Sequence, residues 1–226
     1  MRPPFSFPSG ARPAGSVPFL ISAAVLAVAV AGCGVEDGSA PAGTPIPASS
    51  NGGPVPGSTD GAIAADISAA NLQPCPASDP GAQALENGLP DVVLPCLGNG
   101  PAVRLSGLRG TPMVVNVWQS YCAPCLAELP IMAGVAKRAS GKLMFLGIDY
   151  QDERLGALRM AAKTQMSFPS VQDPARNVGS RLRIAGVPVT FFVRADGTIA
   201  GRAAAAFSDA SALEQQIEQV LGVRVT

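Results

Sequence analysis

The 226-residue sequence contains no histidine, and only 14% of its residues are charged and 5% aromatic. The absence of histidine excludes histidine-based catalytic triads, haem ligation by histidine and most mixed metal sites. Sixteen basic and sixteen acidic residues cancel, and no long basic run occurs, so the charge signature of nucleic-acid binding is missing. We therefore expect no bound metal, no cofactor and no nucleic-acid partner.

Apolar residues make up 47% of the chain, which is sufficient for one ordinary domain with a core and additional tails. No internal repeat is visible. The five cysteines are an odd number, so at least one of them needs a role other than pairing within the chain. They are Cys33, Cys75, Cys96, Cys122 and Cys125.

The most informative stretch surrounds Cys122 and Cys125, which are two residues apart with Pro124 between them. An apolar run over residues 113–118 precedes them and a helix-compatible stretch follows, which predicts a strand, a short loop and a helix beginning at or beside Cys122. Free backbone N–H groups and the positive helix end would favour a thiolate on Cys122. Half a zinc site or a structural bridge are the alternatives, but zinc needs about four ligands and no second Cys-x-x-Cys exists.

The N-terminus has the features of an export signal. Arg2 and Arg12 precede a nearly continuous apolar run from Val17 to Ala31, which is shorter than a typical membrane span of about 20 residues. The run ends in Val-Ala-Gly-Cys33, which resembles a bacterial lipobox. We expect residues 1–32 to be a lipoprotein signal peptide and Cys33 to be lipidated; an uncleaved signal anchor is the alternative.

Residues 34–70 are mostly Gly, Ala, Pro and Ser, a composition that buries too little apolar surface to offset its ordering entropy. We therefore predict that residues 33–70 comprise the lipidated cysteine and a flexible tether, and that residues 71–226 form the folded domain. Lipidation of Cys33 would hold the protein on the extracytoplasmic face of the bacterial cell membrane.

Cys75 and Cys96 flank a segment that is rich in turn residues. Outside the cytosol, a structural disulfide is the simplest role for two such cysteines, and it would attach the N-terminal extension to the domain. A second redox pair or a copper(I)–thiolate site is the alternative.

The pattern of apolar residues and turn signals predicts an α/β domain with a mixed sheet. We expect an N-terminal hairpin over residues 91–94 and 102–105, and a hairpin over 189–193 and 199–203. Ser208 is the expected cap of a last helix, which ends at Gly222. The remaining strands are expected over residues 113–118, 143–148 and 170–172, and the remaining helices over 122–140, 152–166 and 177–182.

Over residues 89–221 the sequence resembles the thioredoxin fold and, within it, the membrane-tethered TlpA/ResA-like thiol–disulfide oxidoreductases. The resemblance implies a mixed central sheet flanked by helices, with an N-terminal hairpin extension and a central helix–strand insertion. Four features carry it: the motif of Trp118, Cys122, Pro124 and Cys125; Glu128-Leu-Pro130; the loop Gly186–Thr190; and the insertion-like segment Tyr150–Pro174.

The resemblance also implies residue roles. Cys122 would attack a substrate disulfide and Cys125 would resolve the mixed disulfide. Pro188 would be cis, which places the backbone of Val187 beside the sulfurs to pair with an extended substrate; from the residues alone, a trans turn is the commoner arrangement. The aromatic residues Trp118 and Tyr121 are the expected substrate contacts, although Tyr121 replaces the tryptophan that is common before the first cysteine.

Glu128 lies one helical turn after Cys125, and the resemblance implies that it tunes the thiol pKa and shuttles protons. The acid that thioredoxins usually bury six residues before the first cysteine is replaced by Asn116, which cannot act as a base. The alternative is that Glu128 is a surface residue favoured near a helix N-terminus.

Together these features predict a reductase of disulfides in exported proteins, such as apocytochrome c or copper-site proteins, which a membrane electron donor re-reduces. The Ala123–Pro124 pair carries no histidine to stabilise a thiolate, so a strongly oxidising potential is not expected. The alternatives are a disulfide-donating oxidase and a copper(I)-binding chaperone. A peroxidase is disfavoured because Gln119 stands where related peroxidases have threonine.

Overall fold

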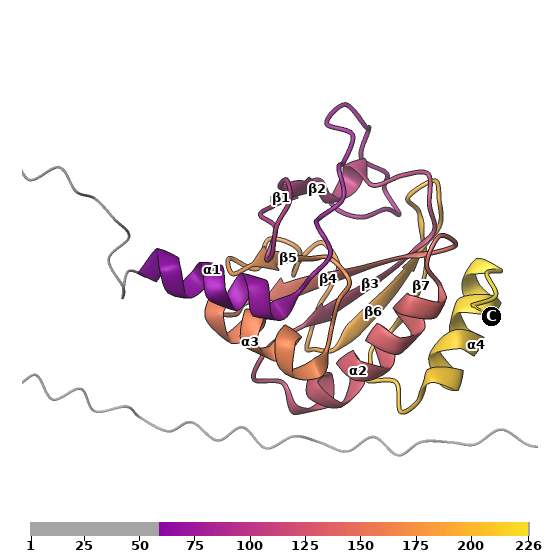
Figure 1. Ribbon diagram of the computed structural model, residues 1–226. Coiled ribbons are helices and arrows are strands. Elements are labelled where there is room, and N and C mark those ends of the chain that lie inside the picture. Colours follow the sequence, from indigo (N-terminus) through magenta and orange to yellow (C-terminus); the bar gives the residue numbers. More distant parts are fainter. Residues whose placement is uncertain (1–58, 226) are drawn as a thin grey trace, which may run out of the picture. The chain divides into compact units, whose positions relative to one another are not determined.

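The apolar run Met113–Trp118 forms the central strand, β3, of a five-stranded sheet (Figure 1). The computed structural model describes residues 59–225. β3 pairs in parallel with β4 (Met144–Tyr150) and antiparallel with β6 (Val189–Val193). The outer strands are β5 (Ser170–Asp173), parallel to β4, and β7 (Ile199–Ala203), antiparallel to β6. The predicted mixed α/β sheet is therefore confirmed, with the order β5-β4-β3-β6-β7.

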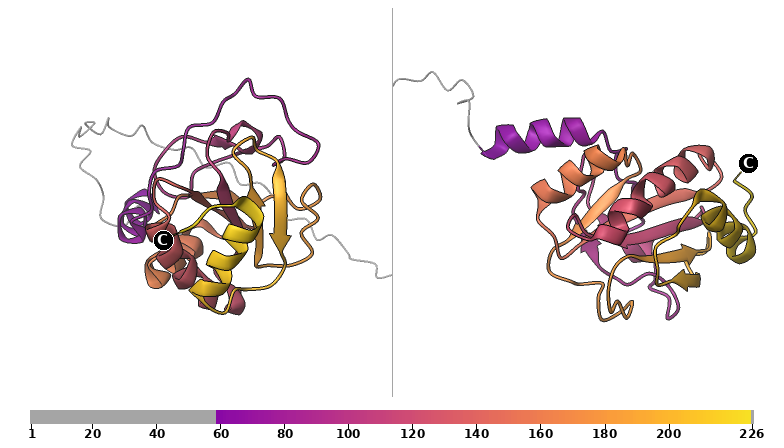
Figure 2. Two further views of the ribbon diagram at one scale, coloured as in Figure 1. Left: turned by 90° about the vertical axis from the view of Figure 1, so that its right-hand side faces the viewer. Right: turned by 90° about the horizontal axis from the view of Figure 1, so that it is seen from below.

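The two faces of the sheet carry two separate apolar cores, because successive side chains of a strand point to opposite sides. Val114 and Trp118 face a core that includes Ala70, before β3 in the sequence, and residues of three helices that follow β3. These helices are α2 (Ala123–Arg138), α3 (Arg154–Thr164) and α4 (Ala210–Leu221), and they cover one face of the sheet (Figures 1 and 2). Val115 and Val117 face the second core, which the N-terminal extension covers.

The predicted N-terminal hairpin is present as β1 (Val93–Leu94) and β2 (Val103–Arg104), followed by a short 3-10 helix at Leu105–Gly107. The extension is joined to the edge of the sheet by backbone hydrogen bonds, since Leu97 N–H donates to the Ser170 carbonyl oxygen at 2.8 Å. Cys75 and Cys96 form a disulfide within this extension.

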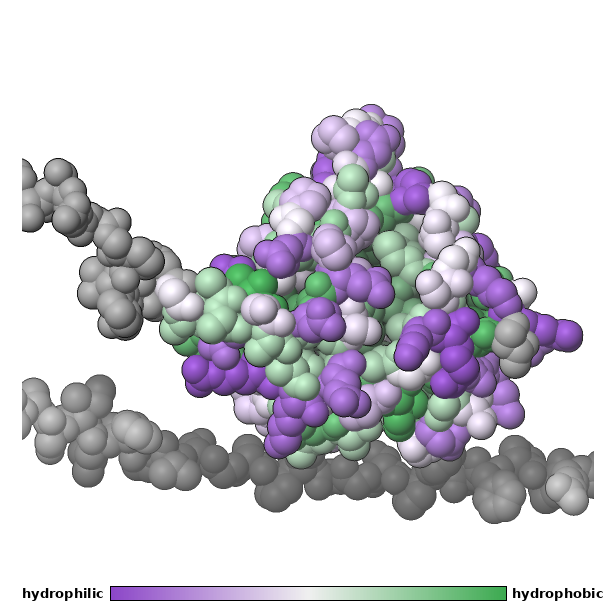
Figure 3. Space-filling view, in the orientation of Figure 1, coloured by the Kyte–Doolittle hydropathy of each residue, from purple (hydrophilic) through white to green (hydrophobic). Residues whose placement is uncertain are grey.

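Helix α1 (Thr59–Ala70) corrects the predicted tether, since its last twelve residues are helical rather than flexible. The composition was misleading because alanine, which is common in linkers, is also the strongest helix former. Ile63, Ile67 and Ala70 recur at helical spacing on the less exposed side of α1, which packs against α3. The outward surface of α1 consists largely of alanine, and Figure 3 shows it as mostly apolar.

Two local predictions were wrong. Residues 177–182 form turns rather than a helix, because Arg176 and Arg183 adopt the left-handed conformation, with φ of 62° and 51°, at either end of the segment. The N-cap of α4 is Asp209 rather than Ser208: the Asp209 carboxylate accepts the Ala212 N–H at 2.9 Å.

The topology places the ends of several strands at one edge of the sheet. The parallel strands β3, β4 and β5 all end there, and β6, which runs antiparallel to β3, begins there. The segments that leave this edge contain Cys122, Asp152 and the loop before Pro188. In open α/β sheets this edge is the usual position of a functional site.

None of the helices within residues 59–225 is long and apolar enough to cross a lipid bilayer. The expected signal peptide and the lipidated Cys33 lie outside the described residues.

Candidate functional site

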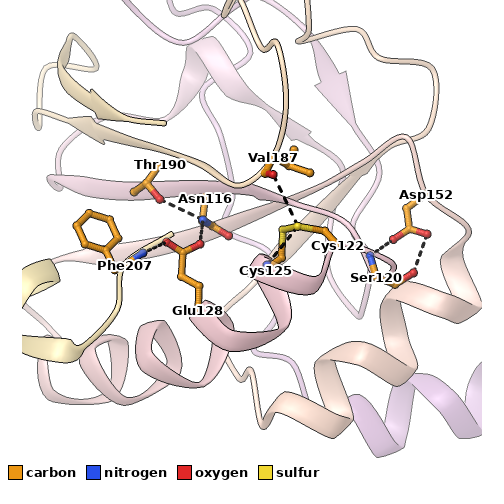
Figure 4. The surroundings of a disulfide bond; sticks show 9 residues. All are labelled: Asn116, Ser120, Cys122, Cys125, Glu128, Asp152, Val187, Thr190 and Phe207. Atoms are coloured by element: carbon orange, nitrogen blue, oxygen red, sulfur yellow. Dashed lines mark hydrogen bonds between the residues drawn. A yellow bond between two sulfur atoms is a disulfide. The ribbon is translucent and has the colours of Figure 1, made fainter. Parts of the chain in front are cut away.

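Helix α2 begins at the first of the two closely spaced cysteines. Cys122 is its N-cap, and its sulfur accepts the Cys125 N–H at 3.2 Å (Figure 4). Pro124 occupies the first turn, where the missing backbone donor has no consequence. The two sulfurs form a disulfide, and the Cα atoms of the two cysteines are 5.2 Å apart. The structure therefore contains the oxidised form of a dithiol at a helix N-terminus, where a thiolate is stabilised on reduction.

The two sulfur-bearing residues differ in exposure. Cys122 is 9% exposed, whereas Cys125 is completely buried behind it. Another molecule that approaches this edge of the sheet meets Cys122 first.

The loop before β6 lies against the disulfide. The Val187–Pro188 peptide bond is cis, and the Val187 carbonyl oxygen is 3.7 Å from the Cys122 sulfur (Figure 4). Pro188 is buried, while Val187 is half-buried. The antiparallel pairing of β6 with β3 brings this loop to the edge from which Cys122 leaves, although 65 residues separate Cys122 and Val187 in the sequence.

Glu128 is buried in the helix-covered core, so the reading of this residue as a surface glutamate is wrong. Its Oε2 accepts an N–H of the Asn116 amide at 3.1 Å, and its Oε1 accepts the Phe207 backbone N–H at 3.0 Å (Figure 4). Burial raises the pKa of the Glu128 carboxyl, and these two hydrogen bonds oppose that shift. Asn116 also donates to Thr190 Oγ1 at 3.1 Å, because the β3–β6 register places these two residues opposite each other.

The two aromatic residues that were expected to contact substrate are placed very differently. Trp118 is completely buried and its Nε1–H donates to Ser170 Oγ at 3.3 Å, so in this conformation it cannot touch a partner and the expectation is corrected. It follows the alternation of β3, which directs it into the helix-covered core. Tyr121 is 65% exposed beside Cys122, and its hydroxyl donates to the Gln151 carbonyl oxygen at 2.8 Å.

Two acids at the end of β4 were not among the site residues predicted from the sequence. Asp152 holds the loop before Cys122, since its carboxylate accepts the backbone N–H and the hydroxyl of Ser120 (Figure 4). Asp149 is buried, and its Oδ2 accepts an N–H of Gln172 at 3.2 Å. Burial, followed by the neighbouring charge of Asp152, raises the pKa of Asp149 to about 8. An acidic pair just beyond a strand was a usable signal, because strand ends in α/β folds carry functional groups.

Comparison of the sequence with known proteins identifies relatives of this chain. The sequence model of the AhpC/TSA family matches residues 85–202. The thiol:disulfide interchange protein DsbE of Pseudomonas fluorescens is 32% identical over 107 residues, which cover 47% of this chain and 58% of that protein. ResA of Bacillus subtilis, a thiol–disulfide oxidoreductase, is 26% identical over 102 residues, covering 45% of this chain and 57% of that protein. The chain thus spans between half and three fifths of the length of these relatives.

Solved structures show the same fold. A secreted disulfide oxidoreductase of Mycobacterium tuberculosis, described as homologous to DsbE of E. coli, superimposes with a TM-score of 0.51 at 24% identity. The superposition covers 57% of this chain and 96% of that one. A protein of Chlorobium tepidum described as a DsbE-type interchange protein gives a TM-score of 0.54 at 24% identity, covering 60% and 96% of the two chains. The fold is therefore thioredoxin-like, as the resemblance implied.

Proposed function

Since the chain belongs to the AhpC/TSA family, within the thioredoxin-like fold, we propose that it is a thiol–disulfide oxidoreductase that reduces disulfides in exported proteins. The observation that carries this proposal is the position of Cys122: a sulfur at a helix N-terminus, partly exposed and 3.7 Å from the carbonyl oxygen of the loop before β6. The names of the relatives, thiol:disulfide interchange protein and thiol–disulfide oxidoreductase, support the same chemistry.

The reaction starts from the reduced dithiol. The Cys122 thiolate attacks one sulfur of a substrate disulfide, forming a mixed disulfide and releasing the other substrate sulfur as a thiolate, which takes up a proton. The Cys125 thiolate then attacks Cys122, which releases the second substrate thiol and forms the Cys122–Cys125 disulfide. Two electrons thereby pass from the protein to the substrate. A dithiol of a membrane electron donor returns two electrons by the same exchange in reverse.

Several groups around the dithiol support these steps. The backbone at Val187 pairs with the extended substrate segment, and the cis Val187–Pro188 bond directs that backbone toward the sulfurs. Tyr121 is the exposed aromatic contact for the substrate. Glu128, one turn from Cys125 and with a raised carboxyl pKa, receives or returns the proton when Cys125 becomes a thiolate.

The direction and the location are part of the proposal. Reduction is favoured over oxidation because neither Ala123 nor Pro124 supplies a positive charge that would over-stabilise the thiolate. Lipidation at Cys33 after removal of residues 1–32 tethers the protein to the extracytoplasmic face of the membrane, where exported substrates and the electron donor are found.

Trapping tests the assigned order of attack. In a Cys125→Ser variant the mixed disulfide cannot be resolved, so we expect a stable covalent adduct between Cys122 and its partner in native membranes. The matched control is Cys122→Ser, which keeps the other cysteine and should trap nothing. Adducts through Cys125 alone, or none with either variant, would refute the mechanism.

The reduction potential separates reductase from oxidase. A value below about −220 mV supports the proposal, whereas a value near −120 mV would make the protein a disulfide donor. Tight copper(I) binding together with negligible reduction of a protein disulfide would instead identify a copper chaperone.

A further inference from the structure

The segment that leads from β5 into β7 is unusually basic. Residues 174–203 contain five arginines, no lysine and a single acid, Asp196, in a chain whose total charge is zero. Three of the arginines, Arg176, Arg181 and Arg183, lie in the loop that ends at the Val187–Pro188 bond. Positive charge is therefore concentrated beside the candidate site.

The backbone and neighbouring rings hold these arginines in position. Arg176 Nε–H donates to the Tyr150 hydroxyl at 3.2 Å, and its guanidinium lies 6.0 Å from the centre of that ring. Arg202 of β7 lies 5.6 Å from the centre of the Phe191 ring and donates to the Arg183 carbonyl oxygen at 3.4 Å. All four of these arginines are exposed, and within residues 59–225 none of them forms an ion pair.

Two open hollows meet at Arg183. One has a volume of about 460 Å³ and is lined by Arg176, Ser180 and Arg183 among others. The other, of about 380 Å³, is lined by Arg181, Arg183 and Arg202 with one acid, Glu86. We call the surface formed by Arg176, Arg181, Arg183 and Arg202 the arginine surface.

A further hollow near the site carries the other charge. This third hollow, of about 420 Å³, lies beside Cys122 and is lined by Tyr121, Asp152 and Glu153. This hollow and the one that contains Arg176 both include residues that follow β4 or β5, namely Gln151 and Pro174 in the first and Arg176 in the second. The surroundings of Cys122 therefore include acids beside Tyr121 and arginines in the loop that ends at Pro188, so a charged substrate segment would be attracted to one group and repelled by the other.

We propose that the arginine surface is the docking site for an acidic stretch of the disulfide-bearing partner protein, next to the cysteine that Cys122 attacks. Guanidinium groups bind carboxylates through paired, charge-assisted hydrogen bonds, and exposed arginines without ion-pair partners are available for them. Long-range attraction would also accelerate the encounter. This inference rests on the proposed reductase function and names its substrate class.

The test uses two disulfide-bonded peptides with the same cysteine-containing core, one flanked by glutamates and the other by lysines. At low ionic strength we expect kcat/KM to be about 10-fold or more higher for the acidic peptide. The charge reversal Arg181→Glu with Arg183→Glu should abolish or invert this preference. At about 1 M salt, where the screening length is about 3 Å, the two peptides should become equivalent.

Lys163→Glu is the matched control, because Lys163 is exposed on α3 and lies near its last residue, away from the arginine surface. It should preserve the peptide preference. Reduction of the uncharged 2-hydroxyethyl disulfide should be the same in all variants. No activity toward that compound would refute the reductase function itself, whereas activity without any peptide preference, or a preference that Lys163→Glu removes equally, would overturn the docking proposal alone.

Discussion

Asp149 offers the sharpest test of the electrostatics beneath the site. Its carboxyl is buried at the end of β4, with Gln172 donating to Oδ2 at 3.2 Å, while Oδ1 has no hydrogen-bond partner among residues 59–225. The charged group that affects the pKa of Asp149 is its neighbour Asp152, and within residues 59–225 no cation offsets this effect. Asparagine has nearly the same shape as a protonated aspartic acid, so Asp149→Asn fixes the side chain in its neutral form.

The expected magnitude follows from linkage. Folding raises the pKa of Asp149 from 3.8 to about 8, so the folded protein binds the proton more tightly than the unfolded chain does. The stability that this proton provides is fully present below pH 3.8 and is lost as the pH rises toward 8. Each pH unit inside this window removes on the order of 1 kcal/mol of stability, so the loss between pH 5 and pH 7 is about 3 kcal/mol.

Urea unfolding of the oxidised protein provides the assay, followed by the fluorescence of the single tryptophan, Trp118. The free energy of unfolding of Asp149→Asn should exceed that of the wild type by an amount that grows with pH across this range. The control is Asp196→Asn, in the exposed turn between β6 and β7. Hydrogen bonds from Thr198 lower the pKa of Asp196, so it is ionised in both states and its effect should be constant. A constant difference for Asp149→Asn as well would show that folding does not shift the pKa of Asp149.

Two further predictions concern the disulfide of the extension and the buried glutamate. Replacing Cys75 and Cys96 together by alanine removes a disulfide between residues with a sequence separation of 21. The free energy of unfolding, measured by urea unfolding, should fall by about 3 kcal/mol. An unchanged free energy of unfolding would show that the extension is held by its backbone hydrogen bonds alone. Glu128→Gln removes a carboxylate one turn from Cys125 and should lower the pKa of the thiols by roughly 1 unit, followed by thiolate absorbance. Titration identical to that of the wild type would assign Glu128 a purely structural role.

Much of the fold could be read from local patterns. The strand Met113–Trp118 was predicted with the observed ends, because an apolar run interrupted only by Asn116 between turn signals has one favourable position, the centre of a sheet. The two hairpins were predicted correctly because Gly-containing turns join segments that are close in sequence. The helix at Thr59–Ala70 was missed because its alanines are common to linkers and helices, and only its packing on α3 distinguishes the two.

The reactive pair could be identified from the sequence alone, since the spacing of Cys122 and Cys125 and the helix that follows them are local properties. The groups that surround this pair follow from the tertiary fold and could not be identified without it. Glu128 is buried beneath Asn116 and Phe207, and Asp152 holds the Ser120 loop, through contacts between residues that are 12, 79 and 32 positions apart. Such contacts depend on strand order and register, which place distant segments at one edge of the sheet and remove water from their charges.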